Sequence, residues 1–426
     1  MIPLAEARAY VLDCVAPLEP VRYPVADAEG CVIAEEVRAT EAIPPFANTA
    51  VDGFAVRAAD TAGATPEEPV RLAVVDTLPA GAAPDRAVYA GEAIRIMTGA
   101  PIPAGADAVV MVEHTSDLDG GATVLIEVEA ASGDAVRPAG DDVEAEDKVL
   151  DSGTALTPGH LGVLTSLGRT DVLVHPRSRV GVLSTGRELV EGDQPLRPGQ
   201  IRDSNRPTLL ALVAGADCVP VDLGLVPDDE DTIAAAVERG VRECDAICTS
   251  GGVSMGEYDY VKAVLDKLGD MRWMQVAIRP AKPFAFGRVT ASERSVPVFG
   301  LPGNPVSSIV SFELFARPAL RRMMGHPDAT LDRPRVKAVA DEPLRRRADG
   351  KTHFARVIAR YGPDGRVHVR SAGGQGSHQL TAMAVANALA IQNDGDGTAP
   401  GGEVDVMLVG EVRAVGGGTT TTFGVA

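Results

Sequence analysis

Hydrophobic and polar positions follow two different periods in this sequence, and the period changes several times along the chain. In residues 178–326, short apolar runs of strand length alternate with segments whose apolar residues recur every three or four positions. This alternation predicts βαβ units, whose right-handed crossovers build a mostly parallel sheet covered by helices on both faces. The predicted strands are 180–184, 218–223, 246–249, 273–278, 283–286 and 296–299, and the predicted helices begin near 205–207, 229, 259 and 305.

The segments on either side of this α/β region have a different pattern. Residues 45–137 and 327–426 contain short β-like runs separated by Gly, Pro and Asp, which predicts an inserted β domain and a C-terminal β domain. Residues 1–44 and 138–177 form the two halves of one further domain, with a helix over 2–15 and another from Thr157 to Gly168. The sequence therefore predicts a multi-domain fold of the α/β plus β class. The other predicted strands are 22–25, 32–37, 70–75, 93–97, 108–112, 123–128, 335–339, 353–360, 367–370, 386–391 and 404–409.

Composition argues against some classes of binding partner. The 426 residues are 45% hydrophobic and carry a formal net charge of −19, which suits several packed domains but not the basic face that nucleic acid or an anionic membrane surface requires. No apolar run is long enough to span a membrane, and the first residues lack the pattern of a signal peptide, so we expect a cytoplasmic protein. The five cysteines and seven histidines show no spacing typical of a disulfide framework or a histidine metal site.

The stretch from Thr249 to Asp259, TSGGVSMGEYD, joins a predicted strand to a predicted helix through three glycines. Glycines let the backbone approach a ligand closely, and the free N–H groups at the start of a helix favour anions. Two carboxylates in the same loop, Glu257 and Asp259, suggest a divalent cation beside a bound phosphate. The stretch indicates a phosphate site, although taken alone it is equally compatible with a tight turn and an acidic first helical turn.

Three other predicted strands end in polar loops, which we expect at the same edge of the sheet. They are STGREL with Glu188, VPDDED with Asp228, and GLPGNP over 300–305, where prolines stiffen a glycine loop. Arg279 and Lys282, in AIRPAKPFAFG, are cations that could face an anion held by these loops, although ordinary surface cations would have the same pattern. Together the four loops predict a phosphate-bearing small ligand near a cation such as Mg²⁺.

Two loops of the predicted inserted domain carry polar groups between prolines. Asp52 is the only carboxylate of IPPFANTAVDGFAV, and Thr98 follows a predicted strand in MTGAPIPAGADAVV. Turn residues of this kind can position polar groups toward a ligand, and an ordinary structural turn is the alternative for each. In the C-terminal region the corresponding polar loop is GGQGSH, over 373–378.

Seven motifs, in order along the chain, resemble the MoeA family of molybdopterin molybdenumtransferases, which includes the E domain of gephyrin. They are PPFANTAVDGFAV, MTGAPIPAGADAVV, RPAGDDV, LSTGREL, SGGVSMGEYDY, RPAKPFAFG and GLPGNPVS, and the resemblance covers nearly the whole chain. The resemblance implies that molybdate and adenylylated molybdopterin react to give molybdenum cofactor and AMP, with Mg²⁺ required. It also implies an elongated homodimer of four-domain subunits, dimerised through the 1–44 and 138–177 domain, with each active-site cleft shared between subunits. The molybdopterin adenylyltransferase and proteins that deliver the cofactor to molybdoenzymes are candidate partners.

The resemblance also implies roles for individual residues. Glu188 and Asp259 are the implied Mg²⁺ ligands, and Arg279, Lys282, Arg356 and Ser377 are the implied molybdate pocket. The implied catalytic residues are Asp52, Thr98, Glu188, Asp228 and Asp259. The implied substrate-binding residues are Ser250, Gly251, Gly252, Ser254, Arg279, Lys282, Pro302, Gly303, Asn304, Pro305, Arg356 and Ser377.

The chain departs from the family pattern in the cationic segment. Arg279 stands where the family has a lysine, and Ala281 stands where it has a glycine. Arginine keeps the positive charge but presents a planar fork where lysine presents a point charge, which bears on molybdate affinity. Two other classes of function remain: a non-catalytic pterin-nucleotide binding or scaffold protein of the same fold, and an adenylyl- or phosphoryl-transfer enzyme that acts on another pterin or nucleotide.

Overall fold

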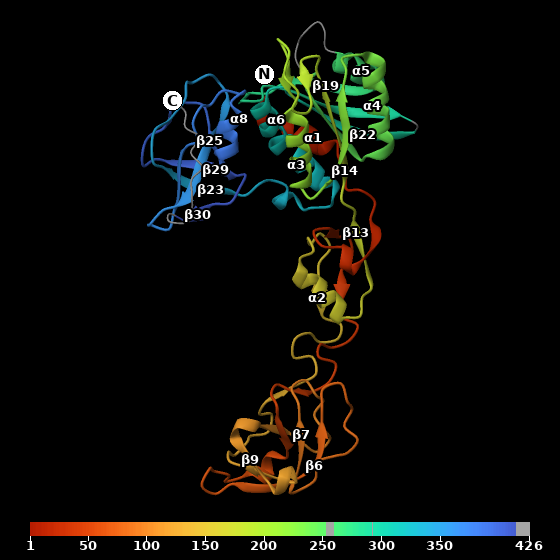
Figure 1. The fold of residues 1–426 in the computed structure, drawn as a ribbon, viewed down its shortest axis with the longest axis vertical. Helices are drawn as coiled ribbons and strands as arrows, with labels where there is room; N and C mark the ends of the chain where they lie inside the picture. Colours follow the sequence, from red (N-terminus) through yellow and green to blue (C-terminus); the bar gives the residue numbers. More distant parts are fainter. Residues whose placement is uncertain (253–259, 292, 415–426) are drawn as a thin grey trace. The chain divides into compact units, whose positions relative to one another are not determined.

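The computed structural model describes residues 1–252, 260–291 and 293–414, and its chain folds into two compact units. The first unit contains residues 1–23, 30–34 and 173–426, and the second contains residues 24–29 and 35–172. Figure 1 shows the α/β part of the first unit in green and its C-terminal part in blue. The division into four domains at the boundaries given above stays a prediction.

A six-stranded sheet forms the α/β part of the first unit. The strand order is β17 (Val219–Val226), β14 (Arg179–Thr185), β18 (Ala246–Ser250), β22 (Arg294–Leu301), β21 (Pro283–Ala291) and β19 (Gly269–Gln275). The first four strands are parallel, as the alternating pattern predicts. β21 and β19 are antiparallel to their neighbours, because the connections on either side of β21 are too short for a crossover helix.

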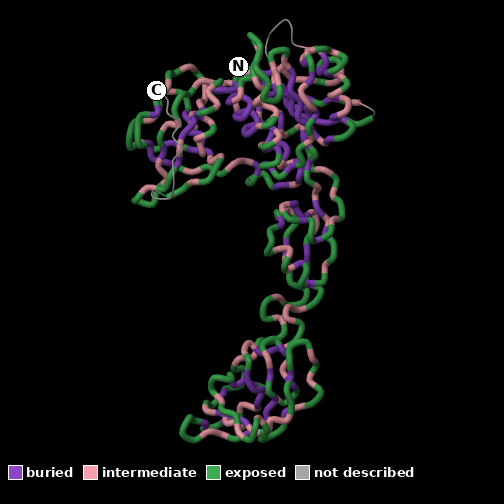
Figure 2. Tube along the Cα trace, viewed as in Figure 1, coloured by how far each residue is buried: buried purple, intermediate pink, exposed green. Residues whose placement is uncertain are grey.

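Helices cover both faces of this sheet (Figure 1). On one face, α4 (Glu230–Glu243) and α5 (Tyr260–Leu268) pack on the sheet and share a buried cluster with it. On the other face, α1 (Leu4–Asp13), α3 (Asn205–Ala214) and the segment α6 (Pro305–Ser311), η5 (Phe312–Ala316) and α7 (Arg317–Met323) pack around phenylalanines of β21 and β22. Phe284 stacks on Phe315 with ring centroids 4.2 Å apart. Buried residues accordingly follow the strands and the inner sides of the helices (Figure 2).

The second unit is built mainly on a separate six-stranded sheet. Its order is β8 (Ala108–Met111), β5 (Gly53–Val56), β7 (Glu92–Ile96), β6 (Val70–Leu78), β10 (Thr123–Ile126) and β9 (Thr115–Leu118). Phe54, Leu72 and Val110 lie in its core. The same unit contains α2 (Pro158–Ser166), which ends where Gly168 adopts a φ of +70°, as expected of a glycine that ends a helix. There are also two small two-stranded sheets. β3 (Val37–Arg38) pairs with β12 (Lys148–Leu150), and β4 (Asn48–Thr49) pairs with β11 (Val136–Arg137).

Three short strands form a small separate sheet. β13 (Asp171–His175) lies between β1 (Val21–Pro24) and β2 (Val32–Ile33). Val174 and His175 pair with Ile33 and Val32 in antiparallel register. A separate parallel pair, β15 (Leu189–Val190) with β16 (Ile201–Arg202), follows β14 along the chain.

The C-terminal part of the first unit is a seven-stranded sheet that recruits one strand from the α/β part. It contains β23 (Arg335–Ala340), β25 (Thr352–Tyr361), β26 (Val367–Ser371), β27 (Ala388–Gln392), β29 (Glu403–Leu408) and β30 (Arg413–Ala414), joined by β20 (Ile278–Arg279). β20 pairs in parallel with β25, so the predicted cationic segment belongs to this sheet. The sequence pattern did not indicate β20 as part of this sheet, the helix α8 (Leu380–Val385), or the pair of β24 (Leu344–Arg345) with β28 (Gly397–Thr398).

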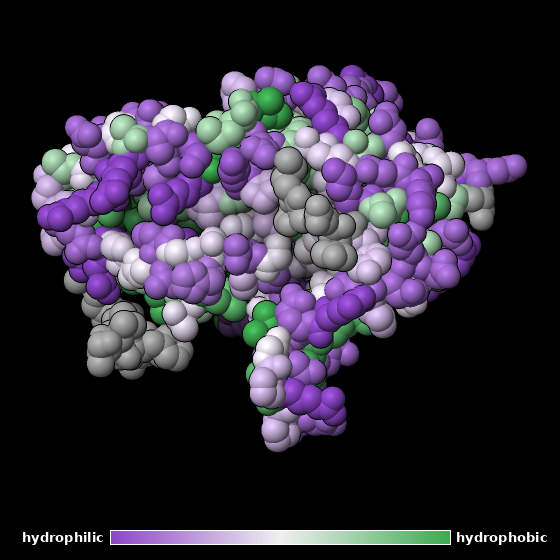
Figure 3. All heavy atoms as spheres, turned by 90° about the horizontal axis from the view of Figure 1, so that it is seen from above, coloured by the Kyte–Doolittle hydropathy of each residue, from purple (hydrophilic) through white to green (hydrophobic). Residues whose placement is uncertain are grey.

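The described surface is mostly hydrophilic on the face shown in Figure 3. Hydrophobic side chains appear there as separated groups among polar ones. Among the residues that the structure describes, no helix is long and apolar enough to cross a membrane.

His368 on β26 links two carboxylates and makes the stability of the C-terminal sheet depend on pH. Its Nδ1 lies 2.7 Å from Asp341 Oδ1 and its Nε2 lies 3.0 Å from Asp364 Oδ1. The hydrogen bond to Asp341, then the one to Asp364, raises the pKa of His368 above 6.5. Because the folded state binds this proton more tightly, the stabilisation is complete below the unfolded pKa and is lost as pH rises through the folded pKa.

We therefore predict that His368→Gln destabilises the protein at pH 5.5 and that the difference shrinks as the pH approaches 9. Urea unfolding of both proteins across this range measures it. His114→Gln is the control, because His114 is exposed and lies in the second unit, outside the C-terminal sheet. A His368→Gln difference that is constant with pH would contradict the prediction.

Candidate functional site

The four parallel strands of the α/β sheet bring their carboxyl ends, and the loops that follow, to one edge. After β14, the backbone N–H of Arg187 donates to Asp228 Oδ2 at 3.0 Å, in the loop after β17. Glu188 follows Arg187 directly and is exposed, whereas Asp228 is half-buried. The Arg187 guanidinium lies over the ring of Tyr260, the first described residue of α5, at 5.8 Å from its centroid. The two predicted acidic loops are therefore brought together at this edge.

Asn205 joins the two predicted glycine loops. Its Nδ2 donates to Ser250 Oγ at 2.8 Å and to the carbonyl oxygen of Gly303 at 2.6 Å. The N–H of Gly251 also donates to Leu301 O at 3.0 Å. The loops after β18 and β22, which are far apart in sequence, are thus hydrogen-bonded to each other. We call the set formed by these loops and those after β14 and β17 the strand-end site.

Sequence reasoning missed Asn205, although a signal was present. The residue stands in DSNRP, directly before the predicted helix, where Asp, Ser and Asn are typical of helix starts. Asp203 in the same segment is almost fully buried and accepts from Ser184 Oγ at 3.3 Å and from Arg206 Nε at 3.2 Å. This buried carboxylate ties the start of α3 to the end of β14, which fixes the position from which Asn205 reaches both loops.

The described residues of the two glycine loops have positions that explain the local sequence. Gly251 and Gly252 have φ values of +90° and +73°, which favour glycine. A Cβ atom on Gly252 would lie 2.3 Å from Cβ of Val261 on α5, so a side chain there would clash with the helix. Pro302 is buried, whereas Gly303 and Asn304 are exposed beside it. Pro305 occupies the first turn of α6, where no N–H is needed.

The predicted metal ligands are only partly described. Ser254, Glu257 and Asp259 lie outside the described residues, so the predicted pairing of Glu188 with Asp259 stays a prediction. Within residues 1–252, 260–291 and 293–414, no group of three or more His, Cys, Asp or Glu side chains is arranged to hold a metal ion. Mg²⁺ needs only one or two protein carboxylates when waters and substrate phosphates complete its shell, so the carboxylates of Glu188 and Asp228 suit it.

Asp229, next to Asp228, has a structural role. Its Oδ1 accepts from the Thr232 N–H at 2.9 Å and from Thr232 Oγ1 at 2.7 Å, which caps the start of α4. These hydrogen bonds lower the pKa of Asp229. Of the two neighbouring acids, only Asp228 faces the strand-end site through its bond to Arg187.

The cationic residues lie along the line where β20 meets β25. Arg279 and Lys282 are exposed, and Arg279 pairs in register with His353. Ala281, between them, has a φ of +79°, the conformation that explains why a glycine is usual there. The backbone of Lys282 is held by the Val276 N–H, which donates to its carbonyl oxygen at 2.8 Å.

Arg356 lies further along β25 and is fully buried. Its Nη2 donates to the carbonyl oxygens of Gly374 at 2.7 Å and Gly376 at 3.2 Å, in the predicted GGQGSH loop. Its Nε and Nη1 are buried with no hydrogen-bond partner among the described residues, and burial lowers the pKa of Arg356 to about 10. Ser377, in the same loop, accepts from the Val306 N–H through its backbone oxygen at 3.1 Å, which joins this loop to α6.

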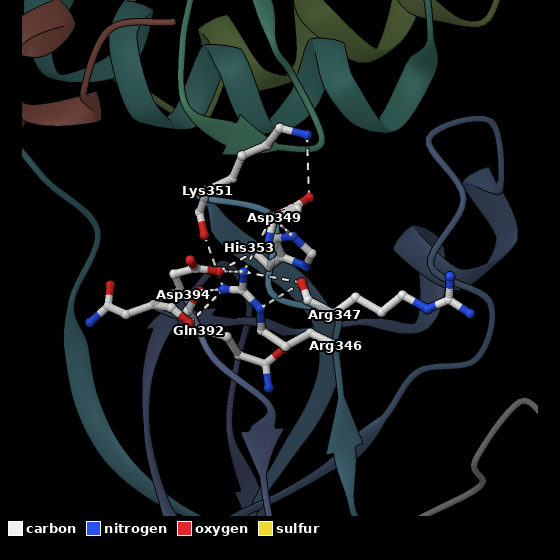
Figure 4. A network of polar contacts seen from close by, with 8 residues as sticks. Arg346, Arg347, Asp349, Lys351, His353, Gln392 and Asp394 are labelled. Atoms are coloured by element: carbon white, nitrogen blue, oxygen red, sulfur yellow. Dashed lines mark hydrogen bonds and ion pairs between the residues drawn. The ribbon is translucent and has the colours of Figure 1, made fainter.

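A polar network holds the turn that leads into β25 (Figure 4). Arg346 is fully buried and donates to Gln392 O at 2.8 Å and to Asp394 Oδ1 at 2.6 Å. Asp349 lies 3.2 Å from Arg346 Nη2 and 3.1 Å from Nε2 of His353, the residue that faces Arg279 across the strands. The network therefore holds the start of β25, the strand with which β20 of the cationic segment pairs.

In the second unit, Asp52 and Thr98 form a hydrogen-bonded pair. Asp52 Oδ1 accepts from the Thr98 N–H and from Thr98 Oγ1, each at 2.7 Å. These two bonds lower the pKa of Asp52, so its carboxylate is ionised at neutral pH. The two residues that the sequence singled out in separate loops are therefore adjacent in the fold.

The fold and the strand-end site define a class of protein: a multi-domain α/β protein with glycine loops at the strand ends, a second β sheet unit and a C-terminal β sheet. Three family models match successive parts of the chain: the MoeA N-terminal region (domain I and II) over residues 2–168, a probable molybdopterin binding domain over 181–322, and the MoeA C-terminal region (domain IV) over 337–409. The first two regions contain the seven motifs that resemble the same family, and the third covers the C-terminal region.

Similar proteins extend over nearly the whole chain. Molybdopterin molybdenumtransferase 2 of Mycobacterium tuberculosis is 41% identical over 396 residues, which cover 91% of this chain and 95% of that protein. Molybdopterin molybdenumtransferase of Haemophilus influenzae is 36% identical and covers 95% of this chain and 97% of its own length. The crystal structure of a molybdopterin biosynthesis moeA protein from Pyrococcus horikoshii matches with a TM-score of 0.76 at 30% identity, covering 96% of this chain and 100% of that one. This chain belongs to the MoeA family of molybdopterin molybdenumtransferases, which confirms the resemblance found in the sequence.

We predict that Gly252→Ala destabilises the protein by about 2–4 kcal/mol, because it adds a clash with Val261 to the cost of a positive φ. The matched control is Gly350→Ala, since Gly350 has a φ of +72° but no atom within 4 Å of the added Cβ. That control should lose only about 1–2 kcal/mol. Urea unfolding measures both, and equal losses would show that the loop does not approach α5 closely.

Proposed function

We propose that this chain is a molybdopterin molybdenumtransferase that transfers molybdate to adenylylated molybdopterin in a Mg²⁺-dependent reaction and releases AMP. The observation that carries the proposal is the hydrogen bonding of the two glycine loops through Asn205, beside the acidic loops of Glu188 and Asp228. The names of relatives that match this chain over nearly its whole length support the same activity.

The strand-end site would bind the phosphates of the adenylylated substrate. Gly251 and Gly303 carry no side chain at this edge, which allows phosphate oxygens to approach the backbone closely. Mg²⁺, when bound, offsets negative charge on the phosphoanhydride as its P–O bond breaks. Glu188 and Asp228 are the described carboxylates that would hold it, and Asp259 is proposed as a further ligand. Positioning of the substrate would supply most of the rate enhancement, since this mechanism needs no covalent nucleophile.

Molybdate is a substrate in this proposal, and the cations of the C-terminal sheet would bind it. Arg356 supports this assignment because it is a buried cation with two donor atoms that have no described partner. Arg279 and Lys282 are exposed cations on the neighbouring β20 segment, and the Ser377 loop lies against α6. A tetrahedral oxyanion would supply the acceptor oxygens that these donors lack.

The remaining parts of the proposal rest on the family. We propose a homodimer in which the Asp52–Thr98 pair of the second unit contributes to a shared active site, and a cytoplasmic location. The four-domain division given above belongs to the same proposal. Candidate partners are the enzyme that supplies the adenylate and the proteins that receive the cofactor.

The activity is tested by measuring AMP release from adenylylated molybdopterin with Mg²⁺, with and without molybdate. We expect release that depends on molybdate, and a loss of about tenfold or more in Glu188→Gln, which removes one carboxylate near the phosphates. Glu238→Gln is the matched control, because Glu238 lies on the exposed side of α4 and forms only a 3.9 Å pair with Arg242. Binding of the substrate without molybdate-dependent AMP release would instead indicate a pterin-nucleotide binding protein.

The molybdate pocket is tested separately by varying the molybdate concentration. Arg279→Ala should raise the concentration needed for half-maximal AMP release by about tenfold, since it removes one charge-assisted hydrogen bond. Arg272→Ala removes a half-buried arginine of strand β19, which pairs with Glu6, and should leave that concentration unchanged. Equal effects of the two substitutions would contradict the assignment of Arg279.

A further inference from the structure

A basic cavity lies in the first unit, between α7 and the segment that leads into β23. It has a volume of about 580 Å³ and is lined mainly by arginines: Arg317 and Arg321 from α7, Arg333 before β23, and Arg335 at its start. Asp332 is the only carboxylate among its lining residues. We call it the α7 cleft. None of its lining residues belongs to the strand-end site or to the cationic segment.

Each carboxylate in and around the α7 cleft forms its close hydrogen bonds with one arginine. The pairs are Arg8 with Asp332 at 2.8 Å, Arg321 with Asp217 at 3.0 Å, and Arg333 with Glu313 through two bonds of 3.0 Å. Five arginines therefore face three carboxylates once Arg317 and Arg335 are included, which leaves a local charge of +2 (5 − 3). This excess stands in a chain whose formal net charge is −19.

The two remaining arginines form only longer ion pairs, each with a carboxylate that another arginine already holds. Arg317 has a side chain 9% exposed and lies 3.9 Å from Glu313, which Arg333 already holds. Its Nη1 donates to Gly215 O at 2.8 Å, and its buried Nε has no hydrogen-bond partner among the described residues. Burial, followed by the nearby Arg333 guanidinium, lowers the pKa of Arg317. Arg335 is 47% exposed and lies 3.8 Å from Asp332, which Arg8 already holds.

An uncompensated guanidinium inside a protein is costly, and its planar fork of donors fits the oxygens of a tetrahedral oxyanion. Arg317 is buried and Arg335 is 47% exposed, and neither has a carboxylate of its own, so together they match an anion of charge −2. We propose that the α7 cleft binds a tetrahedral oxyanion of charge −2, with Arg317 and Arg335 as its charge partners. Sulfate, hydrogen phosphate, a phosphate monoester and molybdate share this chemistry, so the test must separate these sources.

The proposal is tested by isothermal titration of the full chain with sulfate, which has the required charge and shape but is no substrate of the proposed reaction. We expect saturable binding to the wild type. Arg335→Glu should weaken this binding roughly tenfold or more, because it removes a charge-assisted contact and reverses a charge at an exposed position. Lys337→Glu is the matched control: Lys337 lies two residues along β23, is 66% exposed and pairs with Asp405 outside the cleft. It should bind sulfate as the wild type does.

Competition identifies the natural class of anion. Displacement of sulfate by AMP but not by molybdate assigns a phosphate monoester, and displacement by molybdate at lower concentration than AMP assigns a molybdate site. Either result supports the proposal when Arg335→Glu abolishes the binding of that anion. No sulfate binding at millimolar concentration, or binding that Arg335→Glu and Lys337→Glu change equally, would overturn it. Neither result depends on AMP release, so the outcome is separate from that of the proposed transferase activity.

Discussion

The amide of Asn205 holds the strand-end site together, and the rest of the site depends on it. Parallel pairing of β14, β17, β18 and β22 brings their loops to one edge, but it does not fix how those loops lie. The bonds from Asn205 to Ser250 and Gly303 join two loops whose glycines leave the backbone otherwise free to move. Asn205 is itself placed by the buried Asp203, which binds the end of β14 and Arg206. A continuous series of hydrogen bonds thus runs from the sheet to both loops.

Electrostatics complements this arrangement. The chain is strongly acidic, so a site for an anionic substrate must be built from local cations and backbone donors rather than from the overall charge. Arg356 and Arg317 are the clearest examples, because each is largely buried and retains donor atoms without described partners. Arg317 lines the α7 cleft, whereas Arg356 lies on β25 against the GGQGSH loop, and each gives a physical reason for an oxyanion to bind where the net charge would repel it.

Local patterns predicted much of the fold and of the site. The strands and helices of 178–326 were found near the expected residues, because alternation of apolar residues reports burial directly. The family followed from long ordered motifs and is confirmed. The pattern could not distinguish the antiparallel β19 and β21 from further parallel strands, since strand direction is set by the length of the connections.

What sequence reasoning missed depends on contacts between distant residues. Asn205 acts on residues 45 and 98 positions away, and nothing in DSNRP alone shows that. The joining of β20 to the C-terminal sheet, which aligns Arg279 with His353, depends on the packing of two parts of the chain. Asp229 stands beside Asp228 in VPDDED and caps α4, the helix predicted to begin near 229. The contrast between two neighbouring aspartates is visible only once the bond from Arg187 to Asp228 is known.

The most direct test of the strand-end site is to locate bound AMP by crystallography of the full chain soaked with AMP and Mg²⁺. The account predicts phosphate density beside Ser250, Gly251 and Gly303, within reach of the loops that Asn205 joins. AMP bound elsewhere, with these loops free of ligand at saturating concentration, would contradict the assignment of this edge of the sheet as the nucleotide site.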